Sequence, residues 1–248
     1  MSEGQIQALL HDGVALAVQR QAGAGPTFVW LGGFRSDMAG TKAQALADWA
    51  AARGQAFVRF DYSGHGRSGG RFEDGTLSIW LADTLAVLGT IPGPLVLVGS
   101  SMGGWIALLA ARALPARVKA LLLIAPAADF TERLMWPALS PDEQRTIMAD
   151  GRLEQASQYS ADPNVLTRAL IEDGRKHLLM TGPIAFDGPV TILQGGADPD
   201  VPQAHVEALA GLIRAQALKL TIIPDGDHRL SRPQDIEALC AAAEALAR

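Results

Sequence analysis

The sequence predicts an α/β protein in which a mostly parallel sheet carries helices on both faces. Short runs rich in Val, Ile, Leu and Phe recur along the chain. Most of these runs are nearly continuous in apolar residues, which is typical of strands that are covered on both sides. Segments with the apolar spacing of helices lie between most of them. No internal repeat or low-complexity linker interrupts this alternation.

The predicted strands can be taken in chain order. The run at 13–21 alternates apolar and polar residues, so we expect a half-exposed strand there. The later runs are continuous and predict central strands, at 27–33, 56–64, 95–100, 120–126, 190–196 and 218–228. Parallel strands joined by helices are connected by right-handed crossovers, so the loops that follow these strands should meet at one edge of the sheet.

Helices are predicted over 40–54, 77–90, 102–114, 203–216 and 231–248. The last of them contains Cys240, the single cysteine of the chain. One thiol cannot form an internal disulfide, which favours a reducing compartment. We interpret Cys240 as a small buried apolar residue.

The alternation of strand and helix stops between residues 129 and 188. This interval has helical patches at 140–151 and 163–179, and no convincing strand. It is small for an independently stable domain. We therefore predict one domain over residues 1–248, with a small helical cap at about 129–188 that covers the C-terminal edge of the sheet. Three apolar side chains of this cap are expected to line a substrate pocket: Leu134, Met135 and Trp136.

Composition excludes several classes of function. The chain is 48% apolar and 19% charged, with a net charge of −5 and scattered basic residues, which argues against a nucleic-acid partner. No apolar run approaches the roughly 20 residues of a membrane span. The N-terminus lacks the pattern of a signal peptide, so a cytoplasmic protein is expected. No Cys/His cluster has the spacing of metal ligands, so we predict neither a metal nor a cofactor.

A Gly-x-Ser-x-Gly motif stands at the junction of a predicted strand and a predicted helix, and Gly99, Ser101 and Gly103 form it. In this context the motif is typical of a nucleophilic serine on a sharp turn. The helix N-terminus that follows favours developing negative charge. Ser100 is the alternative nucleophile, but the motif has Ser101 at its centre. We expect Ser101 to be the nucleophile.

A nucleophilic serine needs a base. His228 follows the last predicted strand, so its loop should lie at the same edge of the sheet as Ser101. His65 lies in a glycine-rich loop after an earlier strand and is the alternative base. The same loop lacks the lysine of a phosphate-binding loop, and we interpret it as a structural turn.

The base in turn needs an acid that orients it. Asp198 follows the strand at 190–196 and is the first choice, although it could instead cap the next helix. Asp200 is the alternative, because Asp225 and Asp227 are too near His228 in sequence. The order serine, aspartate, histidine along the chain differs from the orders in chymotrypsin and subtilisin.

Two backbone N–H groups are expected to form an oxyanion hole. One belongs to Met102, the residue after the predicted nucleophile. The other should come from the loop after the strand at 27–33, and Phe34 is the preferred donor, with Gly33 as the alternative. Glycines here are equally typical of a plain turn that ends a strand.

With these residues placed, the chain resembles the α/β-hydrolase superfamily, and within it the alpha/beta hydrolase domain-containing protein ten group. The stretches that carry the resemblance are Gly40–Leu46, Val58–Gly70, Leu97–Trp105 and Asp227–Ile236. The resemblance implies the α/β-hydrolase fold, with Ser101, Asp198 and His228 as the nucleophile, acid and base. It also implies hydrolysis of carboxyl esters or acyl thioesters, as by the palmitoyl-protein thioesterase and acyl-glucuronide esterase of animals.

We therefore expect a serine esterase or thioesterase that acts through an acyl-enzyme on a small-molecule or acylated-protein substrate, as a monomer or homodimer. Alternatives within the fold are a carbon–carbon bond hydrolase and a perhydrolase. A different class of alternative is a non-catalytic small-molecule receptor. Fold alone cannot choose between them.

Overall fold

An eight-stranded sheet forms the centre of the computed structural model, which describes residues 4–155 and 164–247. Its order is β1-β2-β4-β3-β5-β6-β10-β12. Strands β1 and β2 are antiparallel to each other and β2 is antiparallel to β4, whereas the other neighbours are parallel. The strands are β1 (Ile6–His11), β2 (Val14–Gln21), β3 (Ala24–Leu31), β4 (Gln55–Phe60), β5 (Leu95–Ser100), β6 (Val118–Ile124), β10 (Pro189–Gly195) and β12 (Ala217–Ile223).

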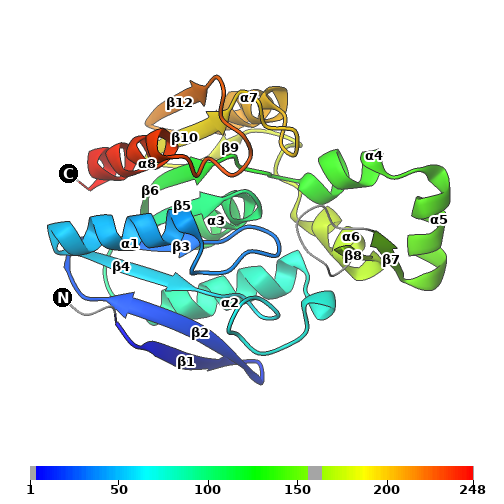
Figure 1. Cartoon of the computed structure of the whole chain (residues 1–248), viewed down its shortest axis with the longest axis horizontal. Helices are drawn as coiled ribbons and strands as arrows, with labels where there is room; N and C mark the ends of the chain where they lie inside the picture. The colour runs from blue at the N-terminus through cyan, green and yellow to red at the C-terminus, as the bar shows by residue number, and fades with distance from the viewer. Residues whose placement is uncertain (1–3, 156–163, 248) are drawn as a thin grey trace.

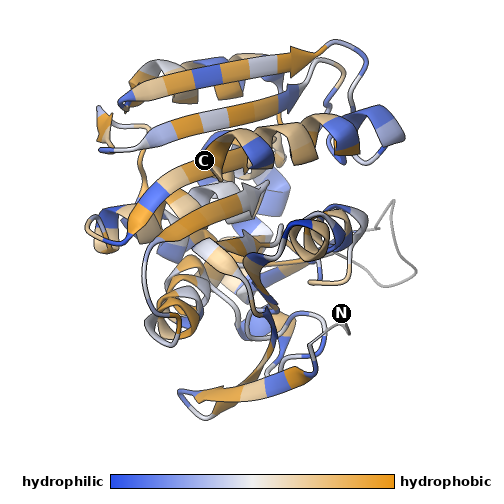
Figure 2. Cartoon of the chain, turned by 90° about the vertical axis from the view of Figure 1, so that its left-hand side faces the viewer, coloured by the Kyte–Doolittle hydropathy of each residue, from blue (hydrophilic) through white to orange (hydrophobic). Residues whose placement is uncertain are grey.

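Helices cover both faces of the sheet, which confirms the predicted fold class (Figure 1). On one face lie α1 (Thr41–Arg53) and α8 (Pro233–Leu246), and on the other lie α2 (Leu77–Gly89), α3 (Met102–Ala113) and α7 (Gln203–Leu212). Strand β5 shows how the sequence produces the two layers. Leu95 and Leu97 pack in the core with α2 and α3, whereas Val96 and Val98 pack in the core with α1 and α8. Figure 2 shows that hydrophobic residues predominate along the central strands.

The predicted cap region projects to one side of the sheet (Figure 1). A π-helical turn at Thr131–Met135 leads into α4 (Trp136–Ala138) and α5 (Pro141–Asp150). Strands β7 (Arg152–Gln155) and β8 (Asn164–Thr167) pair antiparallel, and α6 (Arg168–Gly174) returns the chain to the sheet. Part of the region, 156–163, lies outside the described residues.

The expectation that this interval has no strand was wrong. Strands β7 and β8 have four residues each, and the sequence RLEQ of β7 is too polar to show a strand pattern. Ser140 and Glu143 start α5 with a reciprocal capping box. Leu139, Ile147 and Leu166 form a small separate core between these elements.

Strand β1 was also missed by the sequence reasoning. It is an edge strand whose side chains are mostly exposed, so its residues carry no clear apolar pattern. The remaining elements are short: 3₁₀ turns at Phe72–Asp74 and Arg175–His177, and the paired strands β9 (Ile184–Ala185) and β11 (Ile213–Arg214). Among the described residues, no helix combines the length and the apolar character that crossing a bilayer would require.

Candidate active site

The parallel strands bring three distant side chains to one edge of the sheet. Ser101 follows β5, Asp198 follows β10 and His228 follows β12. The Ser101 Oγ lies 3.0 Å from His228 Nε2, and His228 Nδ1 lies 2.8 Å from Asp198 Oδ2. The sequence therefore named three residues that the fold brings into hydrogen-bond contact.

Ser101 occupies a strained turn between β5 and α3. Its backbone has φ +54° and ψ −120°, in a region that L-residues rarely adopt. The Ser101 N–H donates to the Ile124 carbonyl at 2.9 Å, which ties the turn to β6. A Cβ on Gly99 would lie 2.3 Å from the Gly103 carbonyl oxygen, so the crossing of strand and helix leaves no room for a side chain. This packing explains the glycines of the motif.

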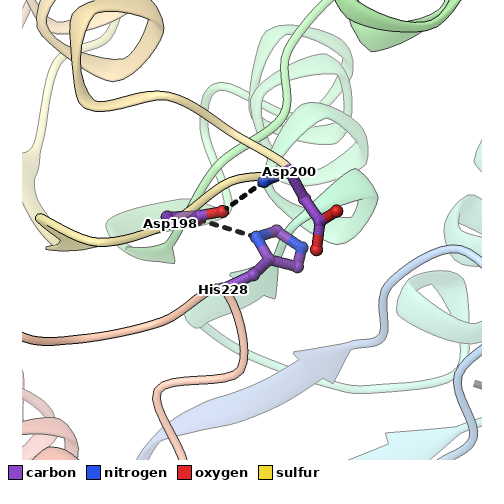
Figure 3. A group of neighbouring side chains, drawn as sticks. All are labelled: Asp198, Asp200 and His228. Atoms are coloured by element: carbon purple, nitrogen blue, oxygen red, sulfur yellow. Dashed lines mark hydrogen bonds and ion pairs between the residues drawn. The ribbon is translucent and has the colours of Figure 1, made fainter. Parts of the chain in front are cut away.

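The Asp198 carboxylate is fixed by hydrogen bonds on both oxygens. Oδ1 accepts from the N–H groups of Asp200 and Val201, at 2.9 and 2.8 Å, and Oδ2 contacts His228 (Figure 3). Burial raises the pKa of Asp198, but the hydrogen bonds from His228, Val201 and Asp200 outweigh burial and hold that pKa below its ordinary value. Asp198 is thus ionised at neutral pH and can only accept.

Because Asp198 Oδ2 can only accept a hydrogen bond, His228 Nδ1 must carry the proton of their contact. In the neutral imidazole, Nε2 is then an acceptor that faces the Ser101 hydroxyl. This tautomer is the one in which His228 can remove the hydroxyl proton.

Gln194 is a contact of this group that the sequence reasoning did not identify. Its side chain, fully buried at the end of β10, donates from Nε2 to Asp198 Oδ2 at 3.3 Å and to the Val201 carbonyl at 2.9 Å. The signal available in the sequence was a polar residue that ends an otherwise apolar strand, four positions before Asp198.

The carboxylates of the other aspartates and the Ser100 hydroxyl do not take part in the contacts between Ser101, His228 and Asp198. Asp225 pairs with Arg232 at 2.7 Å, and Asp227 accepts from the Leu230 N–H at 3.0 Å. Asp200 contributes its backbone N–H rather than its carboxylate to Asp198. Ser100 is still part of β5, and it is Ser101 that contacts the imidazole.

His65, the alternative base, has both ring nitrogens in other contacts. Its Nε2 lies 3.3 Å from the Arg35 nitrogen and its Nδ1 lies 3.2 Å from the Ser63 carbonyl oxygen. Burial lowers the pKa of His65 to about 4. Both of its nitrogens are thus in contacts with residues other than Ser101.

The two predicted oxyanion donors border the same space. A Cβ on Gly33 would lie 4.0 Å from Ser101 Oγ, so the loop after β3 runs beside the hydroxyl. Phe34 and Met102 both line the cavity that contains Ser101. Met102 is the first residue of α3, and the first N–H groups of a helix have no acceptor within it.

A cavity of about 1010 Å³ opens at Ser101 and His228. The residues that the insertion contributes to its walls are mostly apolar, with Phe130, Leu134, Met135, Leu139 and Leu166 beside the polar Gln155. Toward α1 the walls are polar, with Ser36, Asp37, Thr41, Lys42, Arg229 and Ser231. Of the three predicted pocket residues, Leu134 and Met135 line this cavity. Trp136 does not; it packs with the small cap core, and the Arg175 guanidinium lies 5.2 Å from its ring centre.

A second serine, histidine and aspartate meet where the insertion contacts α2, but their geometry differs. Ser78 Oγ lies 2.8 Å from Asp173 Oδ1 and 2.7 Å from His177 Nε2. The aspartate approaches the same ring nitrogen as the serine, at 3.8 Å, so it cannot orient the opposite nitrogen. Asp173 also accepts from the Ser78 N–H, in the first turn of α2. The group connects α6 and the residues that follow it to α2.

Asp198, Asp200 and His228 could by position hold a metal ion, because one potential ligand atom of each lies within 4.8 Å of the others. Both oxygens of Asp198 are, however, already in hydrogen bonds (Figure 3), and both nitrogens of His228 are in hydrogen bonds with Asp198 and Ser101. The arrangement fits an acid–base pair better than a ligand set.

Comparison with known proteins identifies the family. A family model described as serine aminopeptidase, S33, matches residues 32–235, which is most of the chain. The chain belongs to this family of hydrolases. The mitochondrial palmitoyl-protein thioesterase ABHD10 of Mus musculus is 35% identical to this S33-family chain over 226 residues, or 90% of this chain and 76% of the mouse protein.

Solved structures agree with the S33-family assignment. The mouse alpha/beta hydrolase domain-containing protein 10 superposes with a TM-score of 0.90 at 33% identity, over 98% of both chains. A crystal structure of a protein from Agrobacterium vitis S4 gives a TM-score of 0.94 at 48% identity, over 98% of this chain and 99% of that one. The chain is therefore an enzyme of the α/β-hydrolase class, and the resemblance to the ABHD10 group is confirmed. The cytoplasmic location expected from the sequence stays a prediction.

Proposed function

We propose that this protein is a serine hydrolase that cleaves carboxyl esters or acyl thioesters through an acyl-enzyme. The observation that carries the proposal is the continuous chain of contacts from Ser101 Oγ through His228 to the buried Asp198 carboxylate. This chain supplies a nucleophile, a base and an orienting acid, which is what acyl transfer requires.

In the first half of the reaction, Ser101 Oγ attacks the acyl carbonyl carbon while His228 Nε2 takes the hydroxyl proton. Asp198 stabilises the imidazolium cation that forms, without itself becoming protonated. The backbone N–H groups of Met102 and Phe34 donate to the oxyanion of the tetrahedral intermediate. His228 then gives its proton to the leaving oxygen or sulfur, the bond to the acyl carbon breaks, and Ser101 is left acylated.

In the second half, His228 removes a proton from a water molecule, whose oxygen attacks the acyl carbon. The tetrahedral intermediate collapses, the proton passes from His228 to Ser101 Oγ, and the carboxylic acid leaves. Each half-reaction balances without an external oxidant, reductant or cofactor.

The two sides of the cavity suggest how the substrate lies. The apolar side beneath the insertion suits an acyl chain, which gains free energy by leaving water. The polar side continues from His228 to Arg229 and Ser231, so it adjoins the imidazole that protonates the leaving group. ABHD10 proteins are named for the removal of palmitoyl groups from proteins, and an acyl thioester is the substrate class to test first.

The test is labelling of the purified protein with a fluorophosphonate, together with turnover of acyl-CoA, S-acyl-peptide and aryl-ester series of increasing acyl length. We expect labelling at Ser101, no labelling of Ser101→Ala, and steady turnover of an ester or thioester by the wild type. Ser100→Ala is the matched control and should retain labelling.

Labelling that persists in Ser101→Ala would contradict the assignment of the nucleophile. A protein that is acylated once and does not turn over would favour a receptor.

The same substrate series tests the apolar side of the cavity. Leu134→Trp should reduce kcat/KM for long acyl chains more than for short ones, because the larger side chain fills space beside Met135.

A further inference from the structure

The loop after β3 turns sharply beside Ser101. Arg35 has φ +57°, a left-handed conformation that bulky residues rarely adopt. The Ser36 N–H donates to the Gly33 carbonyl at 3.1 Å, which closes a tight turn around Phe34 and Arg35. Strained backbone of this kind persists only where surrounding contacts hold it in place.

His65 supplies such a contact from a different loop. Its Nε2 lies 3.3 Å from the backbone nitrogen of Arg35, and its Nδ1 lies 3.2 Å from the Ser63 carbonyl oxygen. A carbonyl oxygen only accepts, so Nδ1 carries the proton, and Nε2 is then the acceptor of the Arg35 N–H. One tautomer of the neutral ring satisfies both contacts. Burial, which lowers the pKa of His65 to about 4, keeps the ring neutral at neutral pH.

Aromatic rings fix the position of this imidazole. The ring centre of His65 lies 5.1 Å from that of Phe72 and 5.2 Å from that of Trp80. The same two rings contact Phe34, with centres 4.9 and 5.9 Å away. The side chain of Phe34 and the peptide that follows it are therefore held by one cluster, and the His65 side chain is part of that cluster.

We propose that His65 is a positioning residue that holds the Phe34–Arg35 peptide, and through it the Phe34 N–H, in the orientation that binds the oxyanion. It acts as a fixed neutral acceptor and transfers no proton in the reaction. The inference rests on the proposed acyl transfer, because only that reaction gives the Phe34 N–H an oxyanion to bind. It assigns a role to the glycine-rich loop after β4, which the proposed mechanism leaves unused.

The experiment compares two substitutions at one position. His65→Leu removes the acceptor and keeps much of the volume, whereas His65→Gln has a carbonyl oxygen that can accept the Arg35 N–H where Nε2 does now. Loss of one oxyanion donor typically lowers turnover by about 10²–10³, so a misplaced donor in His65→Leu should lower kcat by about 10–100-fold with little change in KM. Fluorophosphonate labelling should slow in parallel. His65→Gln should recover most of both rates.

Three outcomes would overturn the inference: an unchanged kcat in His65→Leu, a loss confined to KM, or His65→Gln being as impaired as His65→Leu. Should His65→Leu fail to fold, the imidazole ¹⁵N and ¹³C chemical shifts of the wild type decide the matter. A proton on Nε2 at pH 7 would exclude acceptance from Arg35. A wild type with neither labelling nor turnover would contradict the proposed function instead, and the tautomer measurement would still test whether His65 accepts from Arg35.

Discussion

Single residues around the site take their protonation states from burial and hydrogen bonding. His65 is the clearest example, because its side chain is buried with Tyr62, Phe72 and Trp80 and its charged neighbour is Arg35. Burial is the main cause that lowers its pKa to about 4, with Arg35 acting in the same direction and the contact with Ser63 opposing both. Protonation of the folded protein at this position is therefore unfavourable.

This shift predicts how stability depends on pH. The unfolded chain binds a proton at His65 near pH 6.5, whereas the folded protein binds it only near pH 4. Above pH 6.5 His65 is neutral in both the folded and the unfolded state, and its full contribution to the free energy of unfolding is present. As the pH falls from 6.5 to 4, only the unfolded state binds the proton, so this contribution is lost. Across that window the free energy of unfolding should fall by on the order of 3 kcal/mol from this residue alone.

Urea unfolding at several pH values checks this expectation, with His65→Gln as the control because Gln does not titrate. From pH 7 to pH 4 the unfolding free energy of the wild type should fall by on the order of 3 kcal/mol more than that of His65→Gln. A difference between the two proteins that stays constant would mean that His65 titrates normally in the fold. His177 and His205, whose pKa values burial also lowers, contribute equally to both proteins.

Among single residues, the sequence predicted those that directly follow a strand. It did not predict the hydrogen bonds by which other residues support them. Ser101, Asp198 and His228 could be chosen because parallel strands end at a common edge. The contacts of Gln194 and His65 could not be predicted. The hydrogen bond of Gln194 with Val201 and that of His65 with Arg35 depend on how separate loops pack.

Among the elements, the crossing of α3 over β3 and β5 is the tightest contact near the site. A Cβ on Gly103 would lie 2.1 Å from the Leu31 carbonyl oxygen and 2.6 Å from that of Gly32. These are backbone atoms of β3 and of the loop that leads to Phe34. Helix and strand can approach this closely only without a side chain at position 103.

Gly103→Ala should therefore separate α3 from β3 and displace the loop that carries Phe34. We expect a loss of about 3 kcal/mol in unfolding free energy and a large decrease in the rate of fluorophosphonate labelling. Gly211→Ala is the matched control, because among the described residues no atom outside its chain neighbours and the backbone of its own helix lies within 4 Å of the added Cβ, and it should stabilise α7 by up to about 1 kcal/mol. Equal stability of both variants in urea would contradict the close approach.

The elements that the sequence predicted share long, continuous apolar patterns. Strand β5 and helix α3 are buried almost throughout, so their residues carry a strong signal. Strands β1, β7 and β8 are short or exposed, and their pairing partners decide their conformation. A pattern read along one segment does not contain that information.

In the whole molecule, residues near the end of the insertion pack in the main hydrophobic core. Leu170, Leu179 and Phe186 pack in the same cluster as the sheet and α2, whereas Ile147 belongs to the small separate cluster. From this distribution we propose one domain with a cap, and we expect the middle of the cap to be its less firmly held part.

We expect one cooperative unfolding transition, with tryptophan fluorescence and far-ultraviolet circular dichroism giving the same midpoint. Hydrogen exchange should show the amides of α5 opening at a lower free energy than those of β5. Ile147→Ala should increase exchange in α5 and leave the global midpoint almost unchanged, whereas Leu170→Ala should lower that midpoint. Two separate transitions would instead identify the insertion as an independent domain.

The sequence predicted that Leu134, Met135 and Trp136 of the insertion line the cavity, and the structure places the first two there but not the third. Leu134 and Met135 line the cavity while the adjacent Trp136 packs elsewhere. The π-helical turn at Thr131–Met135 sets this direction, and a local distortion of that kind has no reliable sequence signal.

The wide separation of the site residues along the chain has a consequence for biosynthesis. Ser101 and His228 are 127 positions apart, and the loop of His228 is followed by α8, which covers one face of the sheet. During translation, Ser101 is therefore synthesised well before His228 and α8. On the proposed mechanism, Ser101 in a nascent chain has no base until His228, which follows β12, has been synthesised.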